Sequence, residues 1–190
     1  MATPVLNYIS EHDCLEAERK VFEKHEYYKG EIFAMSGASF AHNKIFSNLF
    51  GKFSFKLRGK DCNPYGSDVR NHIPINTLHT YPDISIIYGE EETTDDQFDT
   101  ATSPSVIIEI LSKSTRDYDK GSKFTLYRAI ETLKEYILVD ATSILVEKFI
   151  RNADNSWQLT EYRSLTDVFS VSTVGVDITL SDIYQGVKFE

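Results

Sequence analysis

The stretch SVIIEIL (Ser105–Leu111) contains a single charged residue, Glu109. The residues around Glu109 are apolar at successive positions, which is typical of a strand buried on both faces of a sheet. Glutamate is almost never fully buried without a partner, and an uncompensated charge there costs a large part of the stability of a domain. We therefore interpret Glu109 as a functional residue.

The preceding apolar stretch, YPDISIIY (Tyr81–Tyr88), also contains a single charge, Asp83. If the two stretches are antiparallel neighbours, one register places Asp83 opposite Glu109 and Tyr88 opposite Pro104. Side chains directly opposite each other point to the same face with Cβ atoms about 5 Å apart, so the two carboxylates would converge. A divalent ion such as Mg²⁺ relieves their repulsion and keeps positions open for water and phosphate oxygens. Taken alone, an aspartate at a strand start more commonly terminates a turn.

A helix is expected after the Glu109 strand, within residues 112–130. Its possible N-caps are Ser114 and Asp117, and its core-facing stripe consists of Phe124, Tyr127 and Ile130. Lys123 lies on the same stripe, so its ammonium can reach back towards the two carboxylates. The alternative is a lysine whose stem packs on the core while its ammonium lies in water, which is common.

Further segments accompany these residues in a fixed order along the chain. They are YYKGEIFAMSGAS (Tyr27–Ser39), His42, YPD (Tyr81–Asp83), VIIEILSKST (Val106–Thr115), Lys123 with Tyr127 and Arg128, and LKEYILVD (Leu133–Asp140). Together they resemble the Uma-two family of restriction-endonuclease-like proteins, from about His12 to Tyr184. The resemblance implies the PD-(D/E)xK nuclease fold, an α/β (α+β) protein whose restriction-endonuclease-like mixed β-sheet core is flanked by helices. Additional C-terminal strands are expected after this core.

The resemblance also implies roles for individual residues. Asp83 is expected to be the aspartate of the PD half-motif, and Glu109 its acidic partner. The general motif has a lysine two residues after the acid, where this chain has Leu111, and the matching position in this branch is Lys123 on the following helix. A lysine on another element is chemically plausible because it need only reach the attacking water and the scissile phosphate.

Two N-terminal residues resemble further family positions. Glu31, directly after Gly30, is similar to an additional acid of the metal site, and an exposed strand glutamate is the equally weighted alternative. His42 matches a histidine position, but a lone histidine at a helix start is more often a hydrogen-bonding residue than a metal ligand. We therefore assign His42 to positioning.

Length and composition indicate one domain. The 190 residues are 41% hydrophobic and 13% aromatic, enough to bury a substantial core, and no linker or repeat divides them. A single nuclease-like domain over residues 1–190 is expected. The chain start lacks the features of a signal peptide and no apolar run is long enough to span a membrane, so we expect a cytoplasmic protein with no membrane partner. Cys14 and Cys62 are interpreted as free thiols.

The remaining patterns predict the other elements. They are a helix capped by Ser10 that reaches Lys24, a helix over 41–57, and strands over 27–35, within 63–74, and over 136–139, 144–150, 157–162, 168–171 and 176–180. The succession of strand, helix and strand after Glu109 predicts a right-handed crossover between parallel neighbours, and hence a mixed sheet. The C-terminal strands are expected to cover the sheet or to form a dimer interface.

The net charge of −9 argues against strong general binding to duplex nucleic acid, because phosphate neutralisation supplies most of that affinity. The acids between the two central strands are interpreted as a solvated, flexible loop and are Glu90, Glu91, Glu92, Asp95, Asp96 and Asp99. Local basic groups can still form a basic cleft, because net charge describes only the mean potential. A short or single-stranded substrate is the alternative.

These observations and the resemblance predict a metal-dependent endonuclease that hydrolyses phosphodiester bonds of nucleic acid, with DNA as the favoured substrate. Asp83, Glu109 and Glu31 would hold Mg²⁺ or Mn²⁺, and Lys123 would steer a water and stabilise charge on the phosphate. A homodimer is expected from the resemblance. Two alternatives are a protein that keeps the fold but binds or assembles with little or no activity, and a metal-dependent phosphoesterase for small nucleotides.

Overall fold

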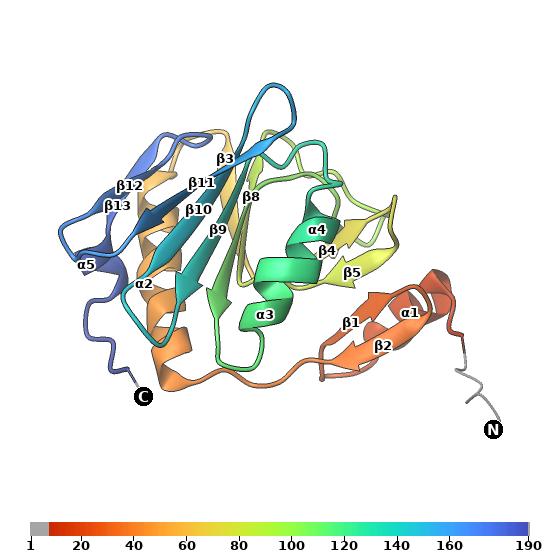
Figure 1. The fold of residues 1–190 in the computed structure, drawn as a ribbon. Helices are drawn as coiled ribbons and strands as arrows, with labels where there is room; N and C mark the ends of the chain where they lie inside the picture. The colour runs from red at the N-terminus through yellow and green to blue at the C-terminus, as the bar shows by residue number, and fades with distance from the viewer. Residues whose placement is uncertain (1–7, 190) are drawn as a thin grey trace.

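The strand that carries Glu109 lies inside a six-stranded mixed sheet (Figure 1). The structure is a computed structural model that describes residues 8–189, so the ends of the predicted domain, residues 1–7 and 190, lie outside the described residues. The strands are β3 (Cys62–Gly66), β6 (Ile84–Tyr88), β8 (Pro104–Leu111), β9 (Glu135–Asp140), β10 (Val146–Arg151) and β11 (Trp157–Tyr162). Their order is β11–β10–β9–β8–β6–β3, and β8 and β9 are the parallel neighbours that the crossover predicts.

The predicted pairing of the two central strands is confirmed in part. The observed pairs before the irregularity are Ile84 with Ile108, Ser85 with Ile107 and Ile86 with Val106. Asp83 immediately precedes the first pair, as the predicted register requires. A shift in register then places Ile87 rather than Tyr88 opposite Pro104, so the prediction for Tyr88 is wrong. A proline cannot donate to the ladder and commonly lies at a bulge, which explains the extra residue in β8.

The two faces of β8 pack against different parts of the molecule. One face, with Val106, Ile108 and Ile110, belongs to the core beneath the helix α2 (Phe40–Lys56). The other face, with Ile107 and Leu111, belongs to a second core that includes Tyr127 and Leu133. Helices therefore cover both faces of the mixed sheet, and the predicted fold class is confirmed.

The helix α2 forms where the sequence predicts it. The Ser39 hydroxyl accepts a hydrogen bond from the His42 N–H and caps the helix, as its residue type favours. Ile45, Leu49 and Phe53 form the buried face. The cap places His42 in the first turn of α2, at the end of the helix that lies near Asp83.

The predicted strand over 27–35 is wrong, because this region is a hairpin of β1 (His25–Tyr28) and β2 (Glu31–Ala34). The turn residues Lys29 and Gly30 both have positive φ, 49° and 90°, which is the conformation of a tight two-residue hairpin loop. The chain reverses there, so residues before and after the turn lie on separate strands.

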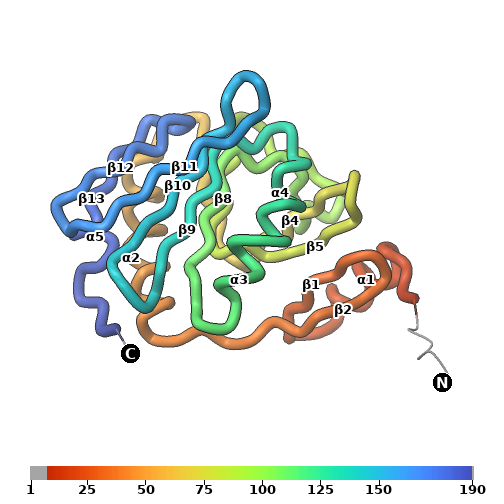
Figure 2. Tube along the Cα trace, viewed as in Figure 1, coloured from red at the N-terminus to blue at the C-terminus, as the bar shows by residue number. Residues whose placement is uncertain are grey.

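The hairpin belongs to a second, five-stranded sheet in the order β2–β1–β5–β4–β7, with β4 (Arg70–Ile73), β5 (Leu78–Thr80) and β7 (Thr100–Ala101). The linker that follows β2 runs past the open end of the central sheet to α2 (Figure 2). The sequence patterns do not predict the strands β5 and β7. These strands have three and two residues, too few to show an alternation of apolar and polar residues.

The first helix, α1 (Glu11–Glu18), has the predicted Ser10 cap but ends before Lys24. The Glu18 carboxylate accepts a hydrogen bond of 2.8 Å from the backbone N–H of His25. This contact holds the chain in the turn that leads into β1, and the turn cannot coexist with a helix continued to Lys24.

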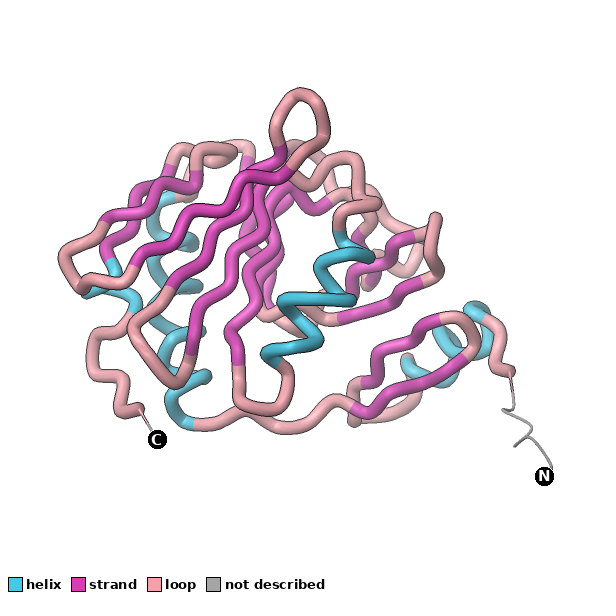
Figure 3. Tube along the Cα trace, in the orientation of Figure 1, coloured by secondary structure: helices cyan, strands magenta, loops and turns pink. Residues whose placement is uncertain are grey.

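The crossover between β8 and β9 contains α3 (Arg116–Tyr118), a π-helical segment (119–123) and α4 (Phe124–Tyr127), which Figure 3 shows as one continuous helical path beside the sheet. Thr115 precedes α3 without a side-chain cap, so the predicted caps Ser114 and Asp117 are wrong. The wider π turn brings both Asp119 and Lys123 to the buried side. Single π turns are rare in proteins, and those that occur are often found at functional sites.

The C-terminal strands are confirmed as β12 (Val168–Val171) and β13 (Val176–Thr179), followed by the short helix α5 (Leu180–Ile183). They form a two-stranded sheet whose buried residues join the core beneath α2. The C-terminal strands therefore cover one face of the central sheet, which is one of the two roles expected for them. Among the helices of residues 8–189, none has the length and apolar character needed to cross a membrane.

Candidate active site

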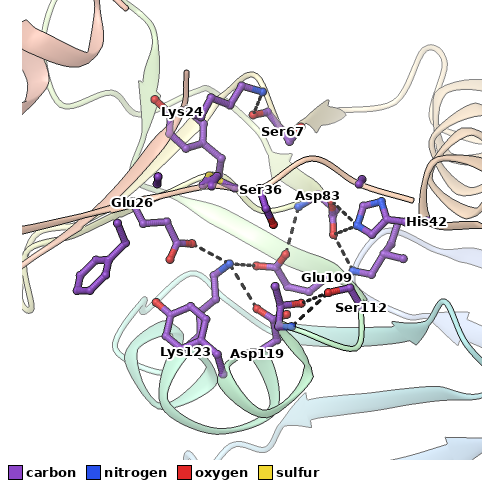
Figure 4. A pocket seen from close by; sticks show the side chains of 18 of the residues that line it. Lys24, Glu26, Ser36, His42, Ser67, Asp83, Glu109, Ser112, Asp119 and Lys123 are labelled. Atoms are coloured by element: carbon purple, nitrogen blue, oxygen red, sulfur yellow. Dashed lines mark hydrogen bonds and ion pairs between the residues drawn. The ribbon is translucent and has the colours of Figure 1, made fainter. Parts of the chain in front are cut away.

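A cavity of about 1110 Å³ opens beside the C-terminal end of β8. Its walls come from β1 and β2, the 35–38 linker, the start of α2 and the helical crossover. Figure 4 shows the acidic side of this cavity, with side chains from separate elements that point towards one another. The ionisable side chains of this cluster are Glu26, His42, Asp83, Glu109, Asp119 and Lys123, and Lys24 also lines the cavity.

Asp83 is held in place by three contacts. Its Oδ2 accepts a hydrogen bond of 2.7 Å from the backbone N–H of Ile110, and Nε2 of His42 lies 3.2 Å from each of its carboxylate oxygens. Its own backbone N–H donates to Oε2 of Glu109 at 3.3 Å. The antiparallel pairing thus brings the two carboxylates together, as the register predicts.

Glu109 is buried, with 4% of its surface exposed. Its Oε1 accepts hydrogen bonds from the Tyr127 hydroxyl at 2.8 Å and from the Lys123 ammonium at 2.9 Å. Burial raises the pKa of Glu109 to about 8; Lys123 opposes this shift, and the charges of Asp119 and Asp83 reinforce it. The carboxylate therefore lies in an environment with too little positive charge.

Lys123 is surrounded by acids. Its Nζ lies 2.9 Å from Glu109, 3.0 Å from Glu26 and 3.5 Å from Asp119. Burial alone would lower the pKa of Lys123, but Glu109, Tyr127, Glu26 and Asp119 raise it well above its usual value. The lysine is therefore a permanent cation that three carboxylates share.

The two other acids around Lys123 differ in their electrostatics. Burial would raise the pKa of Glu26, but the Lys123 charge and hydrogen bonds from Thr80 and Lys123 outweigh it, so this pKa is lowered. Burial raises the pKa of Asp119, and Lys123 offsets this effect only in part. Glu26 is thus the acid best matched to the lysine.

Apolar side chains form another part of the cavity wall. Phe22, Phe33 and Met35 come from the hairpin region, and all three are exposed to solvent. Exposed aromatic rings beside a charged cluster provide flat surfaces on which a planar apolar group can stack. The cavity therefore has an acidic floor and an aromatic wall.

Comparison with known proteins decides the family. Residues 10–181 match the model of the Uma2 family, which is described as "Putative restriction endonuclease". The chain belongs to the Uma2 family. Two proteins of Synechocystis sp. (strain ATCC 27184 / PCC 6803 / Kazusa) are similar to it, "Uncharacterized protein slr1290" and "Uncharacterized protein sll1609". Each is 34% identical; the matches cover 95% of this chain and 94% of the first protein, and 85% of this chain and 91% of the second.

A solved structure supports the fold. The crystal structure described as that of "a putative nuclease belonging to DUF820", from Anabaena variabilis ATCC 29413, matches with a TM-score of 0.73. The match covers 95% of this chain and 99% of that chain, with 16% sequence identity. This likeness shows that the Uma2 chain shares the fold of that protein.

The structure brings most of the predicted site residues of this Uma2 protein together. Asp83, Glu109 and Lys123 lie in one cluster, and His42 contacts Asp83. Glu31 is different: it begins β2, is exposed, and does not line the cavity. The predicted metal-binding role of Glu31 stays a prediction that this arrangement does not support, because Glu31 lies beside the hairpin turn, while the other end of β2 lines the cavity.

Sequence patterns miss two acids of the cluster. Glu26 comes before the hairpin turn, and Asp119 lies in the π-helical segment. A possible signal for Asp119 is its spacing of four residues from Lys123, which places both on one side of a helix. Glu26 has no comparable local signal, because its partner Lys123 is far away in the sequence.

The acidic loop is also more ordered than expected. The Arg19 guanidinium from α1 contacts Asp95 and Asp99, each at 2.8 Å, and Glu91 accepts a hydrogen bond from the Tyr65 hydroxyl. These contacts correct the interpretation of this segment as a freely solvated loop. They also keep part of its negative charge neutralised.

Proposed function

We propose that this protein is a metal-dependent nuclease, and that the cluster around Glu109 is its active site. One observation carries the proposal: Glu26, Glu109 and Asp119 share one cation, Lys123, and Asp83 adds a fourth carboxylate. The other lysine that lines the cavity, Lys24, is paired with Asp68. Buried carboxylates in such excess are strongly unfavourable without a further cation. The Uma2 family description and the fold of the Anabaena protein support the same function.

The donor set suits a hard divalent ion. Asp83 and Glu109 offer carboxylate oxygens, the ligands that Mg²⁺ and Mn²⁺ prefer. Lys123 occupies Oε1 of Glu109, while Oε2 faces Asp83. We therefore assign the ion to Asp83 and Glu109. When bound, such an ion lowers the pKa of water and offsets negative charge on a phosphate.

The remaining residues of the cluster would act on the substrate and on each other. Lys123 lies beside Glu109 and would contact a phosphate oxygen or orient the attacking water. Glu26 lies on the far side of Lys123 from Asp83 (Figure 4), so we assign it to positioning the lysine rather than to metal binding. His42 would hold the Asp83 carboxylate in orientation.

The aromatic wall supports a nucleic-acid substrate, with DNA as our proposal. Phe22 and Phe33 can stack with bases, and stacking of this kind is worth about 1–3 kcal/mol per base. It acts only on bases that are unpaired or flipped, which fits a protein whose net charge of −9 weakens binding to duplexes. Because cutting both strands of a duplex is easiest with two sites, we propose a homodimer.

The first test combines binding and cleavage. Mn²⁺ is titrated calorimetrically into the wild type and Asp83→Asn, and supercoiled plasmid is incubated with each sample. Metal binding and nicking by the wild type, with both lost in the variant, are expected. Binding without nicking in the wild type would contradict DNA as the substrate, and a chromogenic phosphodiester then tests small-molecule phosphoesterase activity.

A second candidate function is nucleic-acid binding or assembly without hydrolysis. Leu111 stands where the general motif has lysine, and Lys123 is already engaged by three carboxylates. If the wild type binds an oligonucleotide but cleaves neither DNA nor RNA with Mg²⁺ or Mn²⁺, this function replaces the nuclease. Gel-shift and cleavage assays on the same labelled oligonucleotide distinguish the two.

A further inference from the structure

Two histidines and a glutamate meet outside the proposed active site. His72 in β4 lies directly opposite His79 in β5, and their rings stack with centroids 4.0 Å apart and an interplanar angle of 7°. Both histidines are buried, while the side chain of Glu11, the first residue of α1, is 39% exposed. None of the three lines the acidic cavity.

The three side chains bring their ligand atoms close together. Nε2 of His72 lies 3.0 Å from Oε2 of Glu11, and Nε2 of His79 lies 3.4 Å from the same oxygen. All three ligand atoms lie within 4.8 Å of one another. Ligands of a tetrahedral zinc ion, with bonds of about 2.0–2.1 Å, are separated by roughly 3.3 Å.

The surroundings of the histidines favour this orientation of their rings. Nδ1 of His72 lies 3.2 Å from Oγ1 of Thr94, and a hydrogen bond at this nitrogen directs the Nε2 lone pair towards Glu11. The ring of His79 is fixed by stacking on His72 and by an edge contact with Tyr27. Both rings are thus held close to Glu11, and because their planes are nearly parallel, they must tilt for both Nε2 lone pairs to reach one ion.

We propose that Glu11, His72 and His79 form a binding site for a transition-metal ion of the Zn²⁺ class. Two imidazole nitrogens and one carboxylate oxygen select such an ion over Mg²⁺, which prefers oxygen ligands alone. The exposed side of Glu11 leaves room for entry and for a water as fourth ligand.

One positive charge lies near the site. The Arg70 guanidinium, which donates to Tyr81 and Thr100, acts electrostatically on both histidines. Its positive charge opposes every cation, so binding depends on the two nitrogen donors, which suit Zn²⁺ far better than Mg²⁺. The site would therefore bind Zn²⁺ and reject Mg²⁺ at comparable concentrations.

A bound ion would connect α1 to the second sheet. Glu11 begins α1, while the two histidines belong to neighbouring strands, so the ion would join elements that are distant in sequence. An ion that binds the folded state but not the unfolded state raises the melting temperature. This inference is independent of the proposed nuclease function.

The test uses Zn²⁺ alone with a full-length double variant, Asp83→Asn and Glu109→Gln, which removes the two proposed metal ligands of the acidic cavity. Calorimetry is expected to show one Zn²⁺ per chain, and Co²⁺ in its place is expected to give the visible absorption of four-coordinate cobalt. Adding His72→Gln or His79→Gln should weaken Zn²⁺ binding by at least about tenfold. The matched control is His12→Gln, since His12 is an exposed histidine on the same helix.

Glu11→Gln keeps the test decisive if a buried histidine variant fails to fold, because Glu11 is partly exposed. Circular dichroism verifies the fold of each variant. Weaker Zn²⁺ binding by Glu11→Gln, with unchanged binding by His12→Gln, supports the site. Zn²⁺ binding that is absent from the folded double variant, or that is unaffected by Glu11→Gln, would overturn the site and leave a hydrogen-bonded structural cluster.

Discussion

Two buried lysines in this molecule, Lys148 and Lys123, differ in the number of carboxylates around them. Lys148 in β10 lies 3.9 Å from a carboxylate oxygen of Glu135 and donates a hydrogen bond to the Ser170 carbonyl oxygen. The other oxygen of Glu135 accepts hydrogen bonds from the Ser172 hydroxyl and from the backbone and side chain of Thr173. Lys123, in contrast, lies among three acids at the edge of a cavity.

The difference is one of charge balance and access. At Lys148, one cation lies beside one anion, hydroxyl and backbone groups bind one oxygen of that anion, and neither residue lines the large cavity. At Lys123, three acids share one cation, and Asp83 adds a fourth carboxylate. A balanced buried pair is a structural element, whereas an unbalanced cluster that faces a cavity is suited to bind a cation.

The largest effect on the free energy of unfolding is expected when either lysine is replaced, and Mn²⁺ should distinguish the two variants. Lys148→Met leaves Glu135 buried without a counter-charge and should lower the free energy of unfolding by about 3–5 kcal/mol. Lys123→Met should also destabilise the protein, but Mn²⁺ should restore part of the loss because the cavity admits an ion. Urea unfolding of both variants with and without Mn²⁺ measures this. Equal recovery of the two variants would contradict the comparison.

Replacing the glutamate beside each lysine, Glu109 or Glu135, should affect the cleavage rate differently. Glu109→Gln is expected to lower the cleavage rate by about 10²–10³-fold, the scale for loss of a group that stabilises transition-state charge. It should not destabilise the protein, since it removes one negative charge from an acid-rich cluster. Glu135→Gln should leave the cleavage rate per folded molecule unchanged and lower stability by about 1–3 kcal/mol. Plasmid nicking and thermal unfolding test both; a loss of nicking in Glu135→Gln alone would reverse the assignment.

The next comparison lies within the β1–β2 hairpin. Glu26→Gln weakens the contact that holds Lys123 and should reduce cleavage about tenfold while Mn²⁺ affinity stays the same. Glu31→Gln should change neither quantity, because Glu31 is exposed and outside the cavity. Steady-state cleavage and Mn²⁺ titration of the two variants provide the measurement. An effect of Glu31→Gln larger than that of Glu26→Gln would restore the role predicted from the sequence.

The smallest effect on stability is expected at the surface ion pairs of Arg19 with Asp95 and Asp99. These pairs show how little a partly exposed ion pair contributes in comparison with the buried ones. The hydrogen bond with Arg19 lowers the pKa of Asp99 to about 2. Because this folded-state pKa lies below the ordinary value near 3.8, the stabilisation is present above about pH 4 and is lost as the pH falls towards 2. The side chain of Asp99 is 34% exposed, so we expect less than about 1 kcal/mol.

Melting temperatures of wild type and Asp99→Asn between pH 6 and pH 2 test this dependence. The two curves should differ above pH 4 and converge near pH 2. Asp96→Asn, at an exposed acid of the same loop, is the control and should follow the wild type throughout. A difference that grows as the pH falls would have the wrong sign for a salt bridge at Asp99.

Much of the fold could be predicted because its signals are local. The strands around Asp83 and Glu109, the α2 helix and its Ser39 cap follow from apolar runs, helical periodicity and a capping residue. The predicted pairing is correct until the irregularity at Ile87, which depends on how the ladder accommodates Pro104. The roles of Asp83, Glu109, Lys123 and His42 stay predictions until the variants are measured.

From its sequence alone, this protein could be predicted to place Asp83 and Glu109 together on neighbouring strand segments, since a single charge in an apolar run is visible without any distant contact. In the structure Asp83 directly precedes β6, and Glu109 lies within β8. Only the tertiary structure decided which other acids join them. A tight turn at Lys29 and Gly30 separates Glu31 from the cluster, while the second sheet and the π-helical segment bring Glu26 and Asp119 to Lys123. These contacts join residues far apart in the chain or depend on a local change of helix type. Their energies come from packing and charge balance, which local periodicity does not encode.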